Sequence, residues 1–377
     1  MSITKNNVEK LGVDLSLLGF GCMRFPTLDG KINEPVAEKM LDEAYARGVN
    51  YFDTAYPYHD GASEPFVGRV LSKYPRESYY LATKLPCWEV STLDDAKRIF
   101  EIQRSRIDKN YIDFYLIHAL NKNSWAKMRD LGVVEYLEEM KNEGKIKYLG
   151  FSFHDGYEVF EDIINYIDWD FCQIQLNYMD TDEQAGMKGY ALAEQKNVPL
   201  VIMEPIKGGL LANLPEDVVS PFNKINSTCS VASWALRWVA SLPNVKVVLS
   251  GMSSEAQLED NLNTFDGFNE LSSEEGAAVE EVAALLRSKV NNGCTGCRYC
   301  MPCPAGVNIP GNFAIWNRYG IYENKGDAMW QWNHEIADNE KAANCIKCGK
   351  CEAACPQKLN IRNDLECVQK DMESISK

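Results

Sequence analysis

Four side chains suited to proton transfer stand where apolar runs of the sequence end. Asp53 and Tyr58 follow a short run of aromatic and small residues, and Lys84 and His118 end the next two apolar runs. A lone Asp or Tyr at such a place is usually a hydrogen-bonded structural residue. Lys and His are a different case, because ion-forming groups do not suit a dry strand unless they are paired. An acid, a phenol, an amine and an imidazole at the ends of three successive strands can move a proton to or from a substrate oxygen.

Eight of the thirteen cysteines form two tight groups near the C-terminus. The motifs are Cys294-x₂-Cys297-x₂-Cys300-x₂-Cys303-Pro304 and Cys345-x₂-Cys348-x₂-Cys351-x₃-Cys355-Pro356. The polar start of the chain lacks the charged-then-apolar order of a secretory signal. Clustered cysteines in such a chain indicate metal binding and argue against disulfides.

The polar side chains are carried by a repeating strand–helix pattern. Expected strands lie at about 17–23, 51–55, 79–85, 112–119, 146–152, 171–177, 199–205 and 245–250. Expected helices lie at about 34–47, 64–74, 93–107, 133–143, 157–166, 184–197, 229–241 and 254–264, and a small hairpin at 8–13 precedes them. Eight such units predict an α/β fold, a closed (β/α)₈ TIM barrel, with a doubly wound open sheet as the alternative.

Composition divides the chain into three parts. Residues 1–271 are predicted to form the barrel, 272–290 a connecting helix, and 291–377 a small, mainly α-helical domain that holds the cysteine motifs. Aromatic residues between the two motifs favour a helical module over a compact β-rich one.

Net charge and hydropathy exclude several classes of partner. The net charge of −15 opposes binding to nucleic acid or anionic lipid, and the sequence indicates no local basic patch that would reverse that repulsion. No apolar run approaches the ~18 residues that span a bilayer. The sequence therefore predicts a cytoplasmic protein without nucleic-acid or membrane partners, and it leaves the oligomeric state open.

The polar residues at the strand ends resemble the catalytic tetrad of the aldo-keto reductases. The flanking words "FDTA", "ATKL" and "IDFYLIH" match as well, and the resemblance covers about residues 8–265. It implies a nicotinamide-dependent oxidoreductase that reduces a carbonyl or oxidises an alcohol. In that chemistry Tyr58 protonates the alkoxide, Lys84 lowers the phenol's pKa, Asp53 orients Lys84, and His118 binds the substrate oxygen.

The same resemblance implies where the cofactor lies. Ser152 and Gln173 match residues that hold the nicotinamide carboxamide, Met203 stands where many relatives stack a Tyr, and Asn261 matches an adenine-side Asn. The other candidate contacts are the strand end Gly21, Cys22 and Met23, the turn Lys207, Gly208 and Gly209, and the segment with Gly251, Ser253 and Gln257. Gly251 and Gln257 replace the Lys and Arg that often clamp a 2′-phosphate, so the sequence favours NAD(H) over NADP(H).

The cysteine motifs resemble those of ferredoxins with two [4Fe–4S] clusters. By that resemblance the last Cys of each motif binds the cluster of the other motif. One cluster takes Cys294, Cys297, Cys300 and Cys355, and the other takes Cys345, Cys348, Cys351 and Cys303. The first motif departs from the pattern, with two residues before its last Cys instead of three. Zinc is the alternative, although zinc hooks do not need three cysteines in a row followed by Cys-Pro.

Three functions remain open from the sequence. The first is a reductase whose clusters exchange electrons with a ferredoxin-type carrier. The second is the same carbonyl reductase with purely structural clusters. The third is a redox sensor or electron-transfer subunit without catalysis, which the tetrad disfavours because a binding module does not need Tyr58 beside Lys84.

Overall fold

The computed structural model describes residues 2–108 and 110–376 and divides into two compact units. The first unit runs to Ala212 and resumes at Ala232–Gly276, and the second consists of Asn213–Val231 and the chain from Ala277 onward. Residues 213–227, to which the sequence assigned no element, thus belong to the second unit. The predicted domain boundaries at 271 and 290 stay a prediction.

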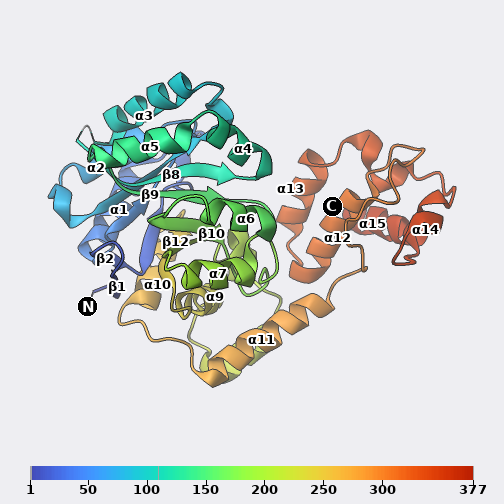
Figure 1. The fold of residues 1–377 in the computed structure, drawn as a ribbon. Coiled ribbons are helices and arrows are strands. Elements are labelled where there is room, and N and C mark those ends of the chain that lie inside the picture. Colours follow the sequence, from blue (N-terminus) through green and yellow to red (C-terminus); the bar gives the residue numbers. More distant parts are fainter. Residues whose placement is uncertain (1, 109, 377) are drawn as a thin grey trace. The chain divides into compact units, whose positions relative to one another are not determined.

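Eight parallel strands close into a barrel, which confirms the predicted fold and excludes the open sheet (Figure 1). In barrel order they are β3 (Leu18–Gly21), β6 (Tyr51–Asp53), β7 (Tyr80–Pro86), β8 (Ile112–Leu120), β9 (Ile146–Phe153), β10 (Phe171–Gln175), β11 (Leu200–Met203) and β12 (Val245–Gly251). The strands are nearly all buried, as expected when helices cover the outer face of a parallel sheet.

Helices follow the strands as the sequence pattern predicts. They are α1 (Glu34–Ala46), α2 (Ser63–Leu71), α3 (Leu93–Ile107), α5 (Val133–Asn142), α6 (Tyr157–Ile164), α7 (Gly186–Gln195), α9 (Val231–Ala240) and α10 (Glu255–Phe265). The sequence missed α4 (Lys122–Asp130), which begins at Asn121. The Asn121 side chain accepts hydrogen bonds from the backbone N–H groups of Asn123 and Ser124, each at 3.0 Å.

An apolar core and a hairpin close the N-terminal end of the barrel. Tyr51, Phe114 and Phe171 pack inside it, and Val8 and Leu15 from the hairpin β1 (Lys5–Val8) and β2 (Val13–Ser16) belong to the same cluster. The predicted hairpin segment 8–13 is mainly the turn between these strands.

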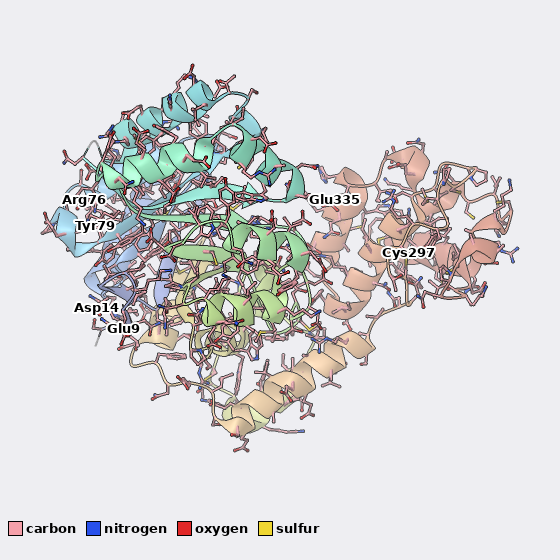
Figure 2. All side chains as sticks on the ribbon, in the orientation of Figure 1. Glu9, Asp14, Arg76, Tyr79, Cys297 and Glu335 are labelled. Atoms are coloured by element: carbon pink, nitrogen blue, oxygen red, sulfur yellow. The ribbon has the colours of Figure 1, made fainter. Side chains whose placement is uncertain are left out.

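Charged side chains near the N-terminal ends of β7 and β8 pair with one another. Arg76 Nη2 lies 2.5 Å from Asp113 Oδ2, Arg76 Nε lies 2.6 Å from Asp108, and Lys147 Nζ lies 3.0 Å from Asp113 Oδ1. The Arg76 guanidinium also lies 5.0 Å from the centre of the Tyr79 ring, and both residues are labelled in Figure 2. This end of the barrel thus has the closed ion pairing expected of a structural region.

The second unit is helical. It contains α8 (Ser220–Asn226), most of α11 (Ser273–Ser288), α12 (Ile309–Tyr322), α13 (Lys325–His334), α14 (Lys350–Ala354) and α15 (Ile361–Ile375). No strand occurs between residues 277 and 376, which confirms the mainly α-helical prediction. Its core contains Phe313, Trp316, Trp332, Leu365 and Val368 together with cysteines of both motifs.

None of the helices in the described ranges is long and apolar enough to cross a membrane.

Candidate functional site

Strand alternation brings the predicted acid, amine and imidazole to one end of the barrel interior. Successive residues of a strand point to opposite faces, so Asp53 shares the inward face of β6 with Tyr51, and Lys84 shares that of β7 with Ala82. On β8, His118 shares its face with Phe114 and Leu116 by the same two-residue period.

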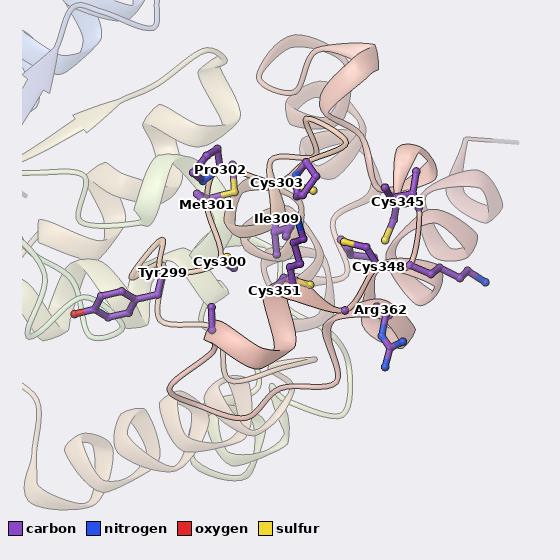
Figure 3. Close-up of a pocket in the computed structure, with 17 residues that line it drawn as sticks. Tyr299, Cys300, Met301, Pro302, Cys303, Ile309, Cys345, Cys348, Cys351 and Arg362 are labelled. Carbon is purple, nitrogen blue, oxygen red and sulfur yellow. The ribbon is translucent and has the colours of Figure 1, made fainter.

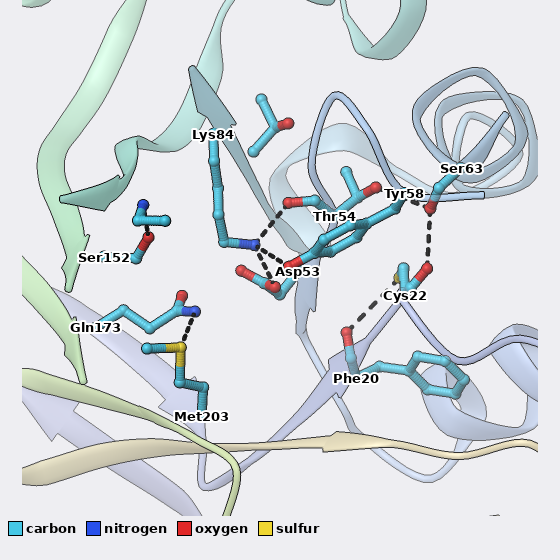
Figure 4. Close-up of polar contacts among 12 residues, drawn as sticks. Phe20, Cys22, Asp53, Thr54, Tyr58, Ser63, Lys84, Ser152, Gln173 and Met203 are labelled. Carbon is cyan, nitrogen blue, oxygen red and sulfur yellow. Dashed lines mark hydrogen bonds and ion pairs between the residues drawn. The ribbon is translucent and has the colours of Figure 1, made fainter. Parts of the chain in front are cut away.

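Lys84 is the centre of this group. Its Nζ donates to Asp53 Oδ1 at 2.6 Å, to the Thr54 carbonyl at 2.8 Å and to the Tyr58 hydroxyl at 3.2 Å, and its side chain is fully buried (Figure 4). Burial alone would lower the pKa of Lys84, but Asp53 and Tyr58 outweigh burial and raise it. Lys84 is therefore a buried cation at neutral pH, held against Asp53.

The Tyr58 hydroxyl keeps its proton at neutral pH. Burial raises the pKa of Tyr58 above its usual 10, while Lys84 acts in the opposite direction with a smaller effect. The sequence predicts that Lys84 lowers the pKa of Tyr58. Lys84 does act in that direction, but the net pKa of Tyr58 is raised because burial has the larger effect. The phenol is positioned as a proton donor.

His118 lies across from Tyr58. The centres of the two rings are 6.1 Å apart in an edge-to-face arrangement, and the Trp88 ring lies 5.1 Å from the imidazole on another side. Burial, and after it the charge of Lys84, holds the pKa of His118 well below 6.5. A neutral imidazole can donate one hydrogen bond and accept another.

Three of the buried polar atoms that have no hydrogen-bond partner within the described ranges belong to candidate site residues. They are Asp53 Oδ2, His118 Nδ1 and Gln173 Oε1. Leaving such an atom unsatisfied costs roughly 1–3 kcal/mol, so their gathering in one place fits a site completed by a ligand.

The candidate nicotinamide contacts lie at this end on neighbouring strands. Ser152 and Gln173 are directly paired in register between β9 and β10, and both are buried. Gln173 Nε2 lies 3.5 Å from the Met203 sulfur, so the amide and the thioether are already in contact (Figure 4). Phe153, the residue after Ser152, is fully buried in the apolar core.

Ser152 also contacts a strained turn beside His118. Its Oγ accepts a hydrogen bond of 2.7 Å from the Ala119 N–H. Ala119 has φ of +52°, and the pairing of β8 with β9 shifts register between Ile117 and Leu120. A β-branched or bulky residue would be costly at this φ, and even alanine is strained there.

The three candidate cofactor contacts at the end of β3 have different environments. Cys22 is fully buried, whereas Met23 is 52% exposed. A Cβ on Gly21 would lie 3.2 Å from the Ser250 carbonyl oxygen. The close approach of β3 to β12 therefore explains this glycine without a cofactor.

The turn after β11 holds its cation in an ion pair. Lys207 Nζ lies 2.5 Å from both carboxylate oxygens of Asp180. Gly208 and Gly209 have φ of +65° and +105°, which glycine adopts readily. The positive charge predicted for a pyrophosphate is thus already compensated by Asp180.

Hydrogen bonds between its own residues stabilise the segment after β12. Ser253 N donates to Gln257 Oε1 at 2.7 Å, and Asn261 Nδ2 donates to Ser250 Oγ at 2.8 Å. A Cβ on Gly251 would lie 2.8 Å from the Arg24 side chain. Arg24 is a neighbour of this segment that the sequence did not reveal.

Sequence reasoning also missed a buried network behind Lys84. Glu64 is fully buried and accepts hydrogen bonds from Thr83 Oγ1 at 2.7 Å and Gln103 Nε2 at 2.6 Å, and it pairs with Arg106 at 3.0 Å. Gln103 Nε2 lies 3.1 Å from the Lys84 carbonyl as well. The only local signal was a glutamate at the start of an apolar helix.

Three aromatic residues in the segments after β6, β7 and β8 have different environments. Trp88 is 53% exposed beside His118, which suits a wall. Trp125 is buried and donates its Nε1–H to Asp162 at 2.6 Å, which makes it a packing residue. Tyr56 is half-buried under the Arg106 guanidinium at 4.7 Å.

The eight motif cysteines line two cavities in the second unit. One cavity of ≈ 200 Å³ is lined by Cys303, Cys345, Cys348 and Cys351, together with Cys300 (Figure 3). The other is lined by Cys294, Cys297, Cys300 and Cys355. The last Cys of each motif thus lies with the other motif, as the crossed assignment requires, and the donor set fits two iron–sulfur clusters. Within the described ranges no three His, Cys, Asp or Glu side chains converge on a point where a single metal ion would sit.

A closed parallel barrel with buried ionisable groups at the C-terminal strand ends, followed by a helical cysteine-rich unit, defines a barrel oxidoreductase with an iron–sulfur module. A model of the aldo/keto reductase family matches residues 17–284, and a model of the 4Fe-4S dicluster domain matches residues 293–359. The chain belongs to the aldo/keto reductase family and carries a C-terminal 4Fe-4S dicluster domain. It is an NAD(P)-dependent oxidoreductase, as the sequence predicted.

Relatives match the barrel over most of their length. The chain is 25% identical to L-galactose dehydrogenase of Arabidopsis thaliana over 74% of this chain and 93% of that protein. It is 24% identical to NADH-specific methylglyoxal reductase of Escherichia coli over 76% and 98%. Among solved structures, the holo form of an aldo-keto reductase from Bacillus halodurans matches with a TM-score of 0.64 and 25% identity, over 74% of this chain and 96% of that one.

Proposed function

We propose that the barrel catalyses the nicotinamide-dependent reduction of a small carbonyl compound, or the reverse oxidation of an alcohol, at Asp53, Tyr58, Lys84 and His118. The observation that carries this proposal is the buried chain of contacts from Asp53 through Lys84 to the Tyr58 hydroxyl, at 2.6 and 3.2 Å. An ion pair between Asp53 and Lys84 with only a structural role would not require a protonated phenol in contact with Lys84.

Each residue has a role that follows from its environment. The bound nicotinamide supplies a hydride to the carbonyl carbon. Tyr58 gives its proton to the substrate oxygen, so that hydride plus proton convert the carbonyl to an alcohol. The Lys84 cation stabilises the phenolate that remains, and Asp53 keeps Lys84 charged and fixed.

His118 and the strand ends beyond it orient the reactants. The neutral imidazole of His118 donates one hydrogen bond to the substrate oxygen, which a buried cation beside Lys84 would do only at an electrostatic cost. Ser152 and Gln173 would hold the carboxamide, and Gln173 Oε1, which has no partner among the described residues, would accept a hydrogen bond from the amide N–H. The Met203 thioether would contact the nicotinamide ring.

For the remainder of the cofactor, we propose NAD(H). Glu255 stands in the first turn of α10, where its carboxylate opposes a 2′-phosphate, although Lys39 pairs with it at 2.5 Å. The relative from Escherichia coli is named as NADH-specific, whereas a fold relative from Klebsiella pneumoniae was solved with NADPH. The named activities of the relatives make methylglyoxal and L-galactose the first substrates to test.

We further propose that the two clusters exchange single electrons with a ferredoxin-type carrier. Bound clusters supply one-electron storage, and two of them exceed what bracing one small unit requires. Purely structural clusters remain the competing function, because motif cysteines belong to the apolar core of the second unit.

Replacing Tyr58 with Phe tests the tetrad. The loss of the proton donor should slow single-turnover carbonyl reduction about 10²–10⁴-fold while the dissociation constant of the nicotinamide nucleotide changes little. The measurement is anaerobic hydride transfer followed by nicotinamide absorbance.

Tyr51→Phe is the matched control, because Tyr51 lies on β6, the strand that leads to Tyr58, and its buried hydroxyl has no hydrogen-bond partner among the described residues. Its rate should equal that of the unchanged protein. A Tyr58→Phe variant with full rate, or equal losses in both variants, would contradict the assignment.

A further inference from the structure

The segments that hold the clusters are basic in an acidic chain. Residues 294–303 and 345–362 carry five basic residues and one acidic residue, whereas the whole chain has a net charge of −15. The basic residues are Arg298, Lys347, Lys350, Lys358 and Arg362, and the acidic one is Glu352. This local reversal of sign was not expected from the composition.

Three of these cations surround one of the two cavities. Lys347, Lys350 and Arg362 line the cavity of Cys303, Cys345, Cys348 and Cys351, and all three are exposed. In Figure 3 the Arg362 side chain extends away from the cavity near Cys348. Cys348 is itself exposed, so a cluster held here reaches the surface of the unit.

An exposed apolar side chain lies among the cations. Ile346 is 65% exposed and lines the same cavity. Thiolate ligands make a bound cluster anionic, and part of the basic charge compensates it. That compensation does not call for an exposed isoleucine, whereas an apolar centre within a charged rim is typical of a transient protein interface.

The three cations are not equally available to a partner. Arg362 binds Glu352 at 2.8 Å, and Lys347 pairs with Glu366. Within the described ranges no carboxylate lies at ion-pair distance from Lys350, which is the first residue of α14. The charge of Lys350 is therefore free to act on an approaching molecule.

We propose that the face formed by Ile346, Lys347, Lys350 and Arg362 is the docking site of an acidic one-electron carrier protein. The proposal rests on the electron-exchange function proposed above. The carrier loses one electron and the cluster beneath the face gains it, with no proton or bond transferred. An acidic carrier would be repelled by the remaining surface of a chain with net charge −15, so charge complementarity directs it to this face.

Lys350→Glu tests the face, and Lys325→Glu is its matched control. Both lysines are exposed, and each is the first residue of a helix, α14 and α13. Both substitutions change the net charge by the same amount. The measurement is isothermal titration of the anaerobic holoprotein with oxidised plant-type [2Fe–2S] ferredoxin, an acidic carrier, at low and high salt.

We expect Lys350→Glu to weaken ferredoxin binding roughly tenfold at low salt, with the difference shrinking at high salt. Lys325→Glu should change it less than about twofold. Equal weakening by both variants, or none by Lys350→Glu, would overturn the proposal.

A second variant distinguishes weaker binding caused by a changed docking face from weaker binding caused by loss of the cluster. Ile346→Ala keeps every charge and should weaken binding to a similar extent at both salt concentrations. Iron and sulfide analysis shows whether each variant retains its clusters. If Lys350→Glu loses its clusters, the test rests on Ile346→Ala. An unchanged ferredoxin affinity of Ile346→Ala would then overturn the proposal. Binding of oxidised ferredoxin involves no hydride transfer, so this test can fail while Tyr58 catalysis stands.

Discussion

Tyr58 and His118 lie across from each other at the C-terminal end of the barrel, and burial shifts their pKa values in opposite directions. Burial disfavours the charged form of each group, so the phenol holds its proton more firmly and the imidazole loses its proton more readily. Both groups are thereby neutral over the physiological range, one as donor of a proton and the other as donor of a hydrogen bond.

The pH dependence of carbonyl reduction follows from these directions. The protonated phenol is the active form, so activity is present below the raised pKa of Tyr58 and is lost as pH rises through it. His118 gains a charge only as pH falls through a pKa well below 6.5. We expect a constant single-turnover rate from about pH 6 to 8, with a decline only at alkaline pH.

Two variants show which residue causes the acid or the alkaline decline of the rate. Tyr58→Phe should remove the alkaline decline, and His118→Gln should leave it in place. An acid decline between pH 6 and 7 that disappears in His118→Gln would show that His118 titrates near its usual value.

At the scale of elements, the end of β8 is a bulge held by the neighbouring strand β9. Ala119 adopts a positive φ immediately after His118, and Ser152 Oγ accepts its N–H. A strained alanine of this kind costs about 1–3 kcal/mol and persists only where surrounding contacts enforce it. The bulge aims the backbone that carries His118, so Ser152 can position the imidazole in addition to holding the carboxamide.

A double-mutant cycle separates these two contributions of Ser152. Ser152→Ala should slow hydride transfer and lower the thermal midpoint, since it removes the hydrogen-bond partner of the partly buried Ala119 N–H, at a cost of about 1 kcal/mol. Ala119→Gly accepts the positive φ without strain and should restore part of both losses in the double variant. Nucleotide affinity, measured separately by fluorescence titration, should not be restored.

If Ser152 acts only through the carboxamide, glycine at 119 will restore neither the rate nor the thermal midpoint. That outcome would show that the hydrogen bond between Ser152 and Ala119 does not position His118.

At the scale of the whole molecule, two cavities imply a definite metal content. Anaerobically prepared protein should contain about eight iron and eight acid-labile sulfide per chain, since the motifs supply ligands for two four-iron clusters. Chemical analysis measures both. Stoichiometric zinc without sulfide would contradict the prediction.

The crossed assignment predicts which substitutions act together. Cys297→Ser and Cys355→Ser should alter the paramagnetic resonance of one reduced cluster, and Cys303→Ser that of the other, following the two sets of lining residues. Cys367→Ser, outside both motifs on α15, is the control and should alter neither. A shared effect of Cys303 and Cys297 would reverse the assignment.

The sequence alone determined the features that depend on local order. Apolar runs that end in Asp53 and Lys84 predicted strand ends there, and the alternation of strand and helix patterns predicted eight units and a closed barrel. Cysteine spacing predicted the cluster ligands for the same reason, since ligands three residues apart are positioned by the chain itself. The family itself was implied by a resemblance, that of the tetrad and its flanking residues to the aldo-keto reductases.

Only the tertiary structure decided the features that depend on contacts between distant segments. The pairing of Lys207 with Asp180, the Glu64 network behind Lys84 and the Ser152–Ala119 contact join residues 19 to 42 positions apart, and no local pattern encodes them. The net pKa of Tyr58 is of this kind as well, because the sequence showed the nearby cation but not the depth of burial that outweighs it. Burial is a property of the assembled barrel, set by every segment that packs around the site.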